Sequence, residues 1–547
     1  MKEICDIDIG FVSEVNGERA LVELTVDTTE PIEGEYYPGQ PGSHVKIPVQ
    51  DKSIVGIVSS VSMHDPKQVE SGGGCAPTVT GRRVADVLLV GTVDERGFAR
   101  GVAVYPVAGQ RVKVLRHDEL GSVFSTFEQS GYSFGRPAAL PSHRAHVQVD
   151  RLFGQHLAVV GTTGCGKSCT VVSMLQQAVR KYEDSHIIVL DLHGEYAAAF
   201  GDETMVIEAD KVELPYWLLS FDEFVDLTVD PGESTARNQV TVLRDAIVRA
   251  RQNTVITEKM DPTMQVTVDS PVYYSLEEMI AQLRNWNIQM VYDNNGQLIQ
   301  GPLYGTFDRF LIRFDTRMVD PRYKFMFNPS VYTDNASLPQ LLRDFLSVGT
   351  GKRMTIIDLS GIPSETVGIV VAVVSRIVFE FNLWNPEHDR FPLLMVYEEA
   401  HNYVPNRSEQ RFNSARNAVE RIMKEGRKYG VGAVVVSQRP KELSETILAQ
   451  CNNFIVMRLT NPDDQAYVRR LVPDSSAGLL SMLPALRTGE ALILGDAVVM
   501  PTRVLVDLPD PRPRSDDVQY AKWWSSGIKD LDVERVIKRW RGRRRDY

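Results

Sequence analysis

Hydrophobic and polar residues alternate in short runs through roughly the first 140 residues of the chain. Two of these runs, 9–15 and 19–25, flank Asn16-Gly17, a dipeptide that accepts the positive φ angles of a tight hairpin turn. Further short runs, separated by turn-rich stretches, follow at 45–49, 53–61, 84–93, 101–105 and 111–115. Many short strands joined by such turns are typical of a small barrel, so we expect a β-barrel domain over residues 1–140.

After residue 140 the hydrophobic residues gather into continuous runs, with longer stretches of helical spacing between them. The runs lie at 157–160, 187–190, 355–359, 393–397, 433–437, 453–458 and 491–494. Continuous apolar strands separated by helices indicate a parallel sheet that is covered by helices on both faces. We therefore predict an α/β core in two parts, residues 141–210 and 346–507.

The strand signal thins between these two parts, over residues 211–345. Helices are expected there at 214–224, 235–252 and 275–286, which predicts a mainly helical insertion. Beyond the core, Pro509, Pro511 and Pro513 disfavour regular structure. We expect an extended C-terminal segment, 508–547, that ends in a basic tail.

The composition is that of an ordinary globular protein. Of 547 residues, 43% are hydrophobic and 24% charged, enough for a large core and about three or four domains. The net charge of −11 argues against a surface that is basic throughout, although basic groups can still gather in a local channel. Five scattered cysteines do not suggest a disulfide framework, and Cys165 and Cys169 lack a second pair of zinc ligands.

Neither a signal peptide nor a membrane anchor is predicted. The chain starts with charged residues where a signal peptide would be apolar. The most apolar helix candidate, 367–381, is interrupted by Arg376 and Glu380 and is shorter than the ~20 residues that span a bilayer. We expect a soluble protein of the reducing cytoplasm.

The strongest chemical motif is Gly161-Thr-Thr-Gly-Cys-Gly-Lys167-Ser168, which matches the phosphate-loop pattern G-x-x-x-x-G-K-[ST] between a strand and a helix. Its backbone N–H groups and the helix N-terminus suit phosphates. Lys167 is expected to reach the β- and γ-phosphates, and Ser168 to bind Mg²⁺. The predicted cofactors are ATP and Mg²⁺, and the predicted nucleotide-binding residues are Gly161, Thr162, Thr163, Gly164, Cys165, Gly166, Lys167, Ser168 and Cys169.

Two adjacent acids, Glu398 and Glu399, follow the apolar run 393–397 at the end of a strand, where open α/β sheets place their ligands. Because side chains alternate along a strand, one acid can face the metal while the next faces the attacking water. We assign Glu398 to Mg²⁺, through a water molecule, and Glu399 to polarising the nucleophilic water. The alternative, without a catalytic role for the two acids, is a strand end exposed to solvent.

Two further strand ends carry polar residues. Asp191, His193 and Glu195 follow the run 187–190 and form either a cluster on the γ-phosphate side or a turn that Asp191 caps. Gln438 follows the run 433–437, where its amide is placed to sense the γ-phosphate.

A basic helix with Arg421, Lys424 and Arg427 precedes the strand of Gln438. In ring ATPases such an arginine enters the neighbouring subunit's site and neutralises charge in the transition state. An exposed basic helix face explains the same residues equally well.

Taken together, the motifs resemble the HerA family, within the HerA/FtsK group of RecA-like P-loop motors. The resemblance rests on the phosphate loop, Asp191-Leu-His-Gly-Glu-Tyr, Leu214-Pro-Tyr-Trp-Leu-Leu, Tyr397-Glu-Glu-Ala-His401, Glu425-Gly-Arg-Lys-Tyr-Gly-Val-Gly, Ser437-Gln-Arg-Pro and Gln450-Cys-Asn-Asn-Phe. It covers nearly the whole chain. One departure is Glu398, where many motors of the group carry Asp, and the longer side chain puts direct metal coordination in doubt.

The resemblance implies a homohexameric ring with double-stranded DNA in its pore and a nuclease, NurA-like, or another effector protein docked on the barrel. It makes Arg427 the trans arginine finger, with Arg421 and Lys424 as weaker candidates, and it makes the C-terminal segment a brace on the neighbouring subunit. His401, in the Glu-Glu-Ala-His motif, is a supporting candidate. Candidate DNA contacts are Arg313, Arg317, Arg322, Lys324, Arg407 and Arg411, although each is more often a solvated surface charge. The tail 538–545 is a further candidate, and a disordered solubilising end explains it equally well.

The predicted function is that of an ATP-hydrolysing hexameric DNA translocase or helicase, the motor subunit of an effector complex in DNA end processing or anti-phage defence. One alternative is a ring scaffold whose ATP state gates a partner enzyme, either a nuclease or a sirtuin-like NAD hydrolase, with little DNA transport. A more remote alternative is a coupling ATPase for conjugation or secretion. Stimulation of ATP hydrolysis by DNA separates the motor from the gate.

Overall fold

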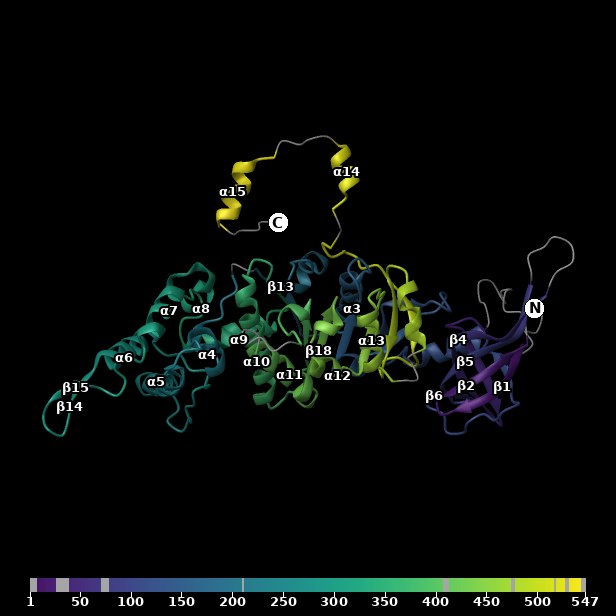
Figure 1. Cartoon of the computed structure of the whole chain (residues 1–547), viewed down its shortest axis with the longest axis horizontal. Coiled ribbons are helices and arrows are strands. Elements are labelled where there is room, and N and C mark those ends of the chain that lie inside the picture. The colour runs from purple at the N-terminus through teal and green to yellow at the C-terminus, as the bar shows by residue number, and fades with distance from the viewer. Residues whose placement is uncertain are drawn as a thin grey trace. The chain divides into compact units, whose positions relative to one another are not determined.

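The computed structural model describes residues 7–25, 39–69, 78–208, 211–406, 413–473, 478–515, 518–526 and 531–542 (Figure 1). The chain divides into two compact units. The first comprises residues 1–183 and 433–513, and the second comprises residues 184–432 and 514–547.

The first unit begins with a β-barrel. Its strands are β1 (Asp8–Asn16), β2 (Arg19–Leu24), β3 (His44–Val49), β4 (Lys52–Val69), β5 (Thr78–Asp94), β6 (Gly97–Arg100) and β7 (Arg111–Val114). The order β2-β1-β7-β3-β4-β5 is closed by pairing of β2 with β5, and β6 adds to β5 outside the closure. The barrel expected from the sequence is therefore confirmed.

Side-chain alternation explains the closed barrel. Along β2, every second residue is buried, so Ala20, Val22 and Leu24 face the barrel core. Gly17, in the hairpin turn before β2, has a φ of 57°. The strand expected at 101–105 is wrong, because β6 ends before Gly101, which has a φ of 93°, and Ala103, Val104 and Tyr105 stay exposed.

The rest of the first unit is α/β. Its elements are α1 (His117–Phe124), β8 (Gly131–Ser133), β9 (Gly135–Pro137), β10 (His146–Gln148), α2 (Val149–Gly154), β11 (Leu157–Val160), α3 (Lys167–Lys181), β18 (Val431–Ser437), α12 (Glu445–Ala449), β19 (Asn453–Val456), α13 (Pro462–Leu471), β20 (Glu490–Leu494) and β21 (Thr502–Val506). Strand β11 lies between β18 and β19 and is parallel to both. This is the buried central strand that leads into the phosphate loop.

Strand β20 corrects one expectation. The run 491–494 was grouped with the parallel strands, but β20 is antiparallel to β19, and β21 and β9 continue in antiparallel pairing. Strands β20 and β21 are consecutive in the chain and pair directly, which antiparallel strands can do without a crossover helix. The hydrophobic run predicts a buried strand, not its direction.

The second unit contains a parallel sheet in the order β13-β16-β12-β17. Its strands are β12 (Ile187–Asp191), β13 (Thr204–Ile207), β16 (Met354–Asp358) and β17 (Leu393–Tyr397). Every residue of β12 and β17 is buried, as expected from their continuous hydrophobic runs. Helix α10 (Ser364–Trp384) packs against α11 (Asn413–Glu425).

Helix α10 is the one helix among the described residues that is long and apolar enough to cross a membrane. Within its most apolar window, 78% is buried inside the protein. A core helix passes the same length and composition test, and burial of this extent is what a core helix has.

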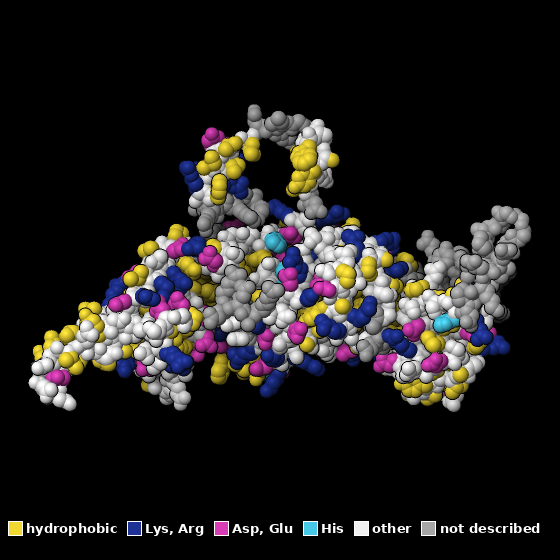
Figure 2. All heavy atoms as spheres, viewed as in Figure 1, with side chains coloured by type: hydrophobic (Ala, Val, Ile, Leu, Met, Phe, Trp, Pro, Cys, Tyr) yellow, Lys and Arg dark blue, Asp and Glu magenta, His cyan; other side chains and the backbone are white. Residues whose placement is uncertain are grey.

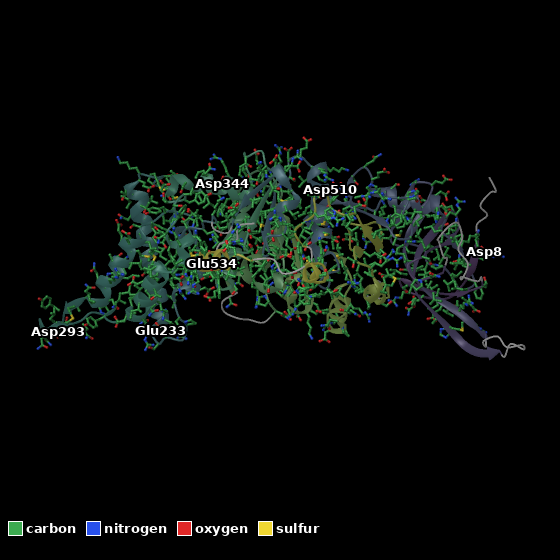
Figure 3. The ribbon with its side chains drawn as sticks, turned by 90° about the horizontal axis from the view of Figure 1, so that it is seen from above. Asp8, Glu233, Asp293, Asp344, Asp510 and Glu534 are labelled. Carbon is green, nitrogen blue, oxygen red and sulfur yellow. The ribbon has the colours of Figure 1, made fainter. Side chains whose placement is uncertain are left out.

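The stretch between β13 and β16 is mainly helical. It contains α4 (Phe221–Thr228), α5 (Ala236–Thr257), α6 (Leu276–Ile288), α7 (Asp308–Val319), α8 (Lys324–Phe327) and α9 (Leu338–Leu346), with the hairpin of β14 (Met290–Tyr292) and β15 (Leu298–Gln300). In the hairpin turn, the Asp293 side chain accepts hydrogen bonds from the backbone N–H groups of Asn295 and Gln297, each at 2.8 Å (Figure 3). The hairpin strands expose several hydrophobic side chains (Figure 2).

The helix expected at 214–224 is wrong in part. Residues Tyr216–Leu218 form a short 3₁₀ turn, and α4 starts only after Ser220. The Ser220 hydroxyl accepts from the Glu223 N–H at 3.3 Å, and the Glu223 carboxylate accepts from the Ser220 N–H at 2.8 Å. This capping box satisfies donors at a helix N-terminus, so it starts a new helix here.

The C-terminal segment leaves β21 without regular structure, as its prolines predict. Gln176 of α3 holds it, donating to the Pro511 carbonyl at 2.9 Å and accepting from the Asp510 N–H at 3.1 Å. Two short helices follow, α14 (Tyr520–Ser525) and α15 (Val533–Gly542). Whether the segment braces a neighbouring subunit stays a prediction, as do the expected domain boundaries.

Candidate active site

The phosphate loop, residues 161–166, joins β11 to the first residue of α3. Gly164 and Gly166 have φ angles of 73° and 98°, which side-chain-bearing residues rarely adopt. A Cβ on Gly161 would lie 2.7 Å from the Cys165 sulfur and 2.9 Å from the Met457 Cβ. Glycine is therefore required at these positions for the loop to turn and to pack against the strands.

Hydrogen bonds tie the loop to neighbouring segments. The Thr162 N–H and hydroxyl both donate to the Arg458 carbonyl, at 2.9 and 3.0 Å. The Cys165 carbonyl accepts from the Gly489 N–H at 3.0 Å, and burial raises the pKa of the Cys165 thiol. Cys165 thus acts here as a neutral packing residue. No motif singles out Arg458 in the sequence, and its one signal is its place just after β19.

Lys167 and Gln438 both lie at the loop. Lys167 is buried, and its ammonium group donates to the Thr162 carbonyl at 3.3 Å. Gln438 follows β18, and the Thr163 hydroxyl donates to its side-chain oxygen. Ser168 and Cys169, in the first turn of α3, are half-buried. The structure thus brings the predicted nucleotide-binding residues and Gln438 together.

Glu398 and Glu399 lie in the second unit, directly after β17. Each side chain is buried, with 3% of the residue exposed. The Tyr403 hydroxyl donates to the Glu398 backbone carbonyl at 2.8 Å, and Glu399 Oε2 lies 3.3 Å from His401 Nδ1. These contacts fix the turn that carries both acids.

The turn differs from the extended strand assumed in the sequence analysis. Strand β17 ends at Tyr397, and Glu399 has φ 46° and ψ 46°, a left-handed conformation for a residue other than glycine. Such a conformation costs on the order of 1 kcal/mol or more. Alternation along a strand therefore does not set the directions of the two carboxylates, and the turn does.

The surroundings of the two acids are rich in buried acidic and phenolic groups. Burial raises the pKa of Tyr196 well above its usual value, and the carboxylates of Glu398 and Asp191 add to the rise. Burial also raises the pKa of Tyr403, with Glu398 adding to it. A divalent cation is bound by oxygen ligands and offsets such negative charge, so the two acids have the chemistry of Mg²⁺ ligands. Among the described residues, no group of three or more His, Cys, Asp or Glu side chains is placed to hold a metal ion.

Asp191 has the contacts of a turn-capping residue. Its carboxylate accepts hydrogen bonds from the N–H groups of Gly194 and Tyr196, each at 2.9 Å, and of His193 at 3.3 Å. Burial raises its pKa to about 6, against the lowering by these hydrogen bonds. Of the two interpretations left open by the sequence, these contacts favour the capped turn. His193 is exposed and Glu195 half-buried, and their roles stay predictions.

Comparison with known proteins supports the resemblance. Residues 132–378 match the family model described as Helicase HerA, central domain. The DNA double-strand break repair helicase HerA of Sulfurisphaera tokodaii is 24% identical over 520 residues, covering 91% of this chain and 94% of the relative. A probable DNA double-strand break repair helicase HerA of Methanocaldococcus jannaschii is 25% identical over 564 residues, covering 95% and 100%. The chain is thus similar to HerA helicases over most of its length. The predicted resemblance is confirmed, and the chain is an ATPase of the helicase class.

Two solved structures are similar at lower levels. VirB4 of Thermoanaerobacter pseudethanolicus is 16% identical with a TM-score of 0.45, covering 69% of this chain and 97% of that one. The plasmid coupling protein TrwB in complex with a non-hydrolysable ATP analogue is 14% identical with a TM-score of 0.44, covering 71% and 92%.

The three basic candidates for a trans arginine differ in their contacts within the chain. The Arg421 guanidinium lies 4.4 Å from the centre of the Phe379 ring, and Lys424 pairs with Glu420 at 3.0 Å. Arg427 lies in the 3₁₀ turn Gly426–Tyr429, is exposed, and forms no ion pair with another residue of the described chain. Arg427 is therefore the one of the three whose charge is not already balanced.

Most candidate DNA contacts that the structure describes are already engaged. Arg313 pairs with Glu233, Arg322 pairs with Asp320 at 2.6 Å, and Arg317 lies over the Tyr323 ring at 5.8 Å. Lys324 is exposed. Arg407 and Arg411 lie outside the described residues, as does the end of the basic tail from residue 543.

Proposed function

We propose that this ATPase, similar to HerA helicases, is an ATP-driven DNA translocase, whose phosphate loop binds the nucleotide and whose acid pair after β17 serves its hydrolysis. The observation that carries the proposal is the pairing, in one chain, of a complete phosphate loop with two buried adjacent carboxylates at a strand end. A phosphate loop alone suits nucleotide binding. The second acid adds a group that can orient water for hydrolysis.

Binding of the nucleotide falls to the phosphate loop. Its backbone N–H groups and the start of α3 hold the phosphates, because both present partial positive charge to an anion. Lys167 neutralises the β- and γ-phosphates. A bound Mg²⁺ would neutralise negative charge on the phosphates, and Ser168 and Glu398 would hold it, Glu398 through a water molecule.

Hydrolysis needs a water molecule in line with the γ-phosphate. Glu399 accepts the hydrogen bond that orients and polarises this water, and His401 at 3.3 Å holds the carboxylate. Gln438 senses the γ-phosphate through its amide. Arg427 of one subunit neutralises the developing charge in its neighbour's site, a role that its exposure and free charge support.

The proposal includes a homohexameric ring with double-stranded DNA in the pore and a nuclease, NurA-like, or another effector on the barrel. The names of the relatives, DNA double-strand break repair helicases, support a role in DNA repair. A role in anti-phage defence would use the same ATP-driven motor. A cytoplasmic location follows from this role.

Steady-state ATP hydrolysis with and without linear duplex DNA tests the proposal. DNA should stimulate hydrolysis, and stimulation should fade as salt rises, because phosphate contacts release counterions. Lys167→Ala should abolish turnover, whereas Lys211→Ala, at an exposed lysine outside the site, should not change it. Hydrolysis that is lost in Lys167→Ala but indifferent to DNA would favour a ring that gates a partner enzyme. Full activity of Lys167→Ala would refute the site.

A further inference from the structure

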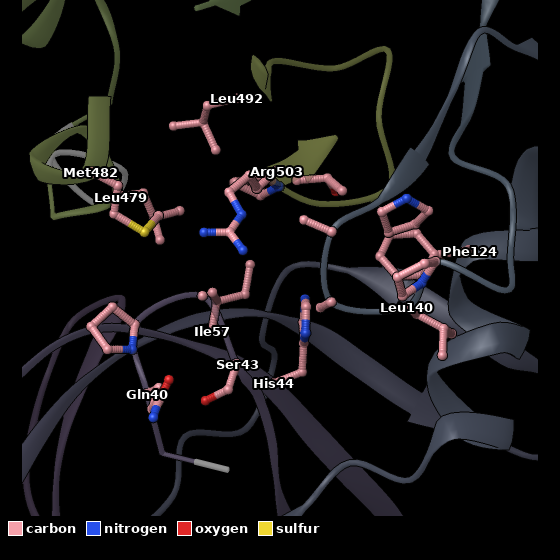
Figure 4. A pocket seen from close by; sticks show the side chains of 18 of the residues that line it. Gln40, Ser43, His44, Ile57, Phe124, Leu140, Leu479, Met482, Leu492 and Arg503 are labelled. Atoms are coloured by element: carbon pink, nitrogen blue, oxygen red, sulfur yellow. The ribbon is translucent and has the colours of Figure 1, made fainter. Parts of the chain in front are cut away.

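A cavity of about 410 Å³ lies in the first unit (Figure 4), and no residue of the phosphate loop lines it. One wall comes from the barrel, with Ser43 and His44 at β3 and Ile57 in β4. The other walls come from α1 with the segment 137–142, and from the turn Leu479–Ala485 with β20 and β21. Clefts of this volume are of the size that binds small molecules.

The lining combines an apolar surface with one unbalanced positive charge. Side chains of Ile57, Phe124, Leu140, Leu479, Met482 and Leu492 form the apolar part. The lining contains two arginines and no acidic residue. Arg487 is engaged outside the cavity by Glu490, whose carboxylate accepts from its side chain at 2.7 and 2.9 Å and from its N–H at 3.0 Å.

Arg503 supplies the unbalanced charge. Along β21, Thr502, Val504 and Val506 are buried on one face, so Arg503 projects from the other. Its guanidinium reaches into the cavity between the turn Leu479–Ala485 and the barrel (Figure 4). Within the part of the chain that the structure describes, no carboxylate forms an ion pair with Arg503. Glu490 is near enough to act on it electrostatically but is held by Arg487.

Ser43 lines the same cavity from the barrel wall (Figure 4). Only 5% of the residue is exposed, and its hydroxyl has no hydrogen-bond partner among the described residues. A buried hydroxyl is normally hydrogen-bonded, and an unpaired one costs stability. His44 beside it does not add charge, because burial lowers its pKa to about 4. Among the polar groups of the lining, the Arg503 guanidinium thus forms no ion pair and the Ser43 hydroxyl has no hydrogen-bond partner within the described residues, and both groups can donate to an anionic oxygen.

We propose that this cavity binds a small organic anion, a carboxylate or phosphate carried on an apolar body. The anionic head accepts hydrogen bonds from Arg503 and Ser43, and the body packs on Ile57, Leu140 and Leu479. Such a ligand contacts the barrel and the strands β20 and β21 at once, so its binding stabilises their arrangement within the first unit. The site is separate from the nucleotide site and does not depend on the proposed function.

Calorimetric titration of the full-length protein with phenyl phosphate, benzoate and benzyl alcohol tests the proposal. Both anions share the aromatic body, and the comparison between them tells a phosphate site from a carboxylate site. At least one anion should bind with a stoichiometry of one per chain, and the uncharged alcohol should bind at least about tenfold more weakly, because a charge-assisted hydrogen bond is lost. Equal binding of all three, or binding of none at millimolar concentration, would overturn the proposal.

Variants assign the binding to the cavity. Arg503→Gln should weaken binding of the anion by at least about tenfold, and Ser43→Ala should weaken it by a few-fold. Arg136→Gln, at an exposed arginine of β9 outside the lining, should leave binding unchanged. Binding that survives in Arg503→Gln but disappears in Lys167→Ala would place the anion in the phosphate loop and refute the cavity site. Unchanged ATP hydrolysis of Arg503→Gln without ligand confirms that the variant is folded.

Discussion

The replacement Glu399→Gln isolates the chemical step of ATP hydrolysis. Glutamine has nearly the same shape, so it keeps the turn after β17 and the contact with His401, which lies 3.3 Å from the carboxylate. It removes the negative charge that polarises water. Because the residue is only 3% exposed, bulk water cannot take over the role of the carboxylate. Because glutamine keeps the shape of the turn, the affinities for ATP and Mg²⁺ should stay within a few-fold of wild type.

The expected fall in kcat follows from the burial of Glu399. General-base groups contribute about 10²–10⁴-fold to rate, which corresponds to about 3–5 kcal/mol of transition-state stabilisation. We expect the upper half of this range, a fall in kcat of about 10³-fold or more. Glu398→Gln is the matched comparison at the neighbouring buried acid, and it should instead raise the Mg²⁺ concentration needed for half-maximal turnover.

Single-turnover hydrolysis and nucleotide-binding titrations, made on both variants, measure the two effects separately. A turnover of Glu399→Gln within about threefold of wild type would refute the assignment of the water-polarising role to this residue. So would an exchange of phenotypes, with Glu398→Gln losing the chemical step and Glu399→Gln changing only the Mg²⁺ requirement. That second outcome would reverse the two assignments while keeping the site.

Three further predictions follow from other parts of the structure. Subunits carrying Arg427→Ala, mixed with Glu399→Gln subunits, should regain part of the hydrolysis that each variant lacks; no regain at any ratio would exclude action of Arg427 in trans. The fully buried Asp191 has a pKa of about 6, so the folded protein binds a proton there more tightly than the unfolded chain does. The free energy of unfolding should therefore fall by up to about 3 kcal/mol as pH rises from about 4 through 6. Asp191→Asn should remove this slope from melting temperatures measured across that range, and an unchanged slope would contradict it. Arg376→Met should destabilise the second unit by about 3–5 kcal/mol, because it leaves the buried Glu223, paired with Arg376 at 2.8 Å, uncompensated; a melting temperature equal to wild type would show that the pair contributes nothing.

Continuous hydrophobic runs predicted the strands of both units well. The runs 157–160 and 393–397 coincide with β11 and β17, because strands buried on both faces carry hydrophobic residues without interruption and stop at the first polar residue. The barrel strands were predicted by alternation, which reflects one buried and one exposed face. The phosphate loop was predicted in full, since its glycines are fixed by backbone geometry.

Features that depend on distant contacts were not predicted. The direction of β20 is set by its partners β19 and β21, and a hydrophobic run carries no direction. The left-handed conformation of Glu399 is held by the surrounding turn rather than by its residue type. The hydrogen bond from Thr162 to the Arg458 carbonyl joins segments that follow β11 and β19, two strands far apart in sequence. The cavity at Arg503 likewise joins segments from opposite ends of the first unit.

Displacement of a third strand from a DNA triplex tests the central claim most directly, because it detects movement along duplex DNA independently of strand separation. Wild-type protein with ATP and Mg²⁺ should displace the third strand, and Glu399→Gln and Lys167→Ala should not. The same protein without ATP should leave the triplex intact. DNA-stimulated ATP hydrolysis by wild type without any displacement, under conditions where the triplex is otherwise stable, would contradict a translocase and favour a ring that uses ATP to gate a partner.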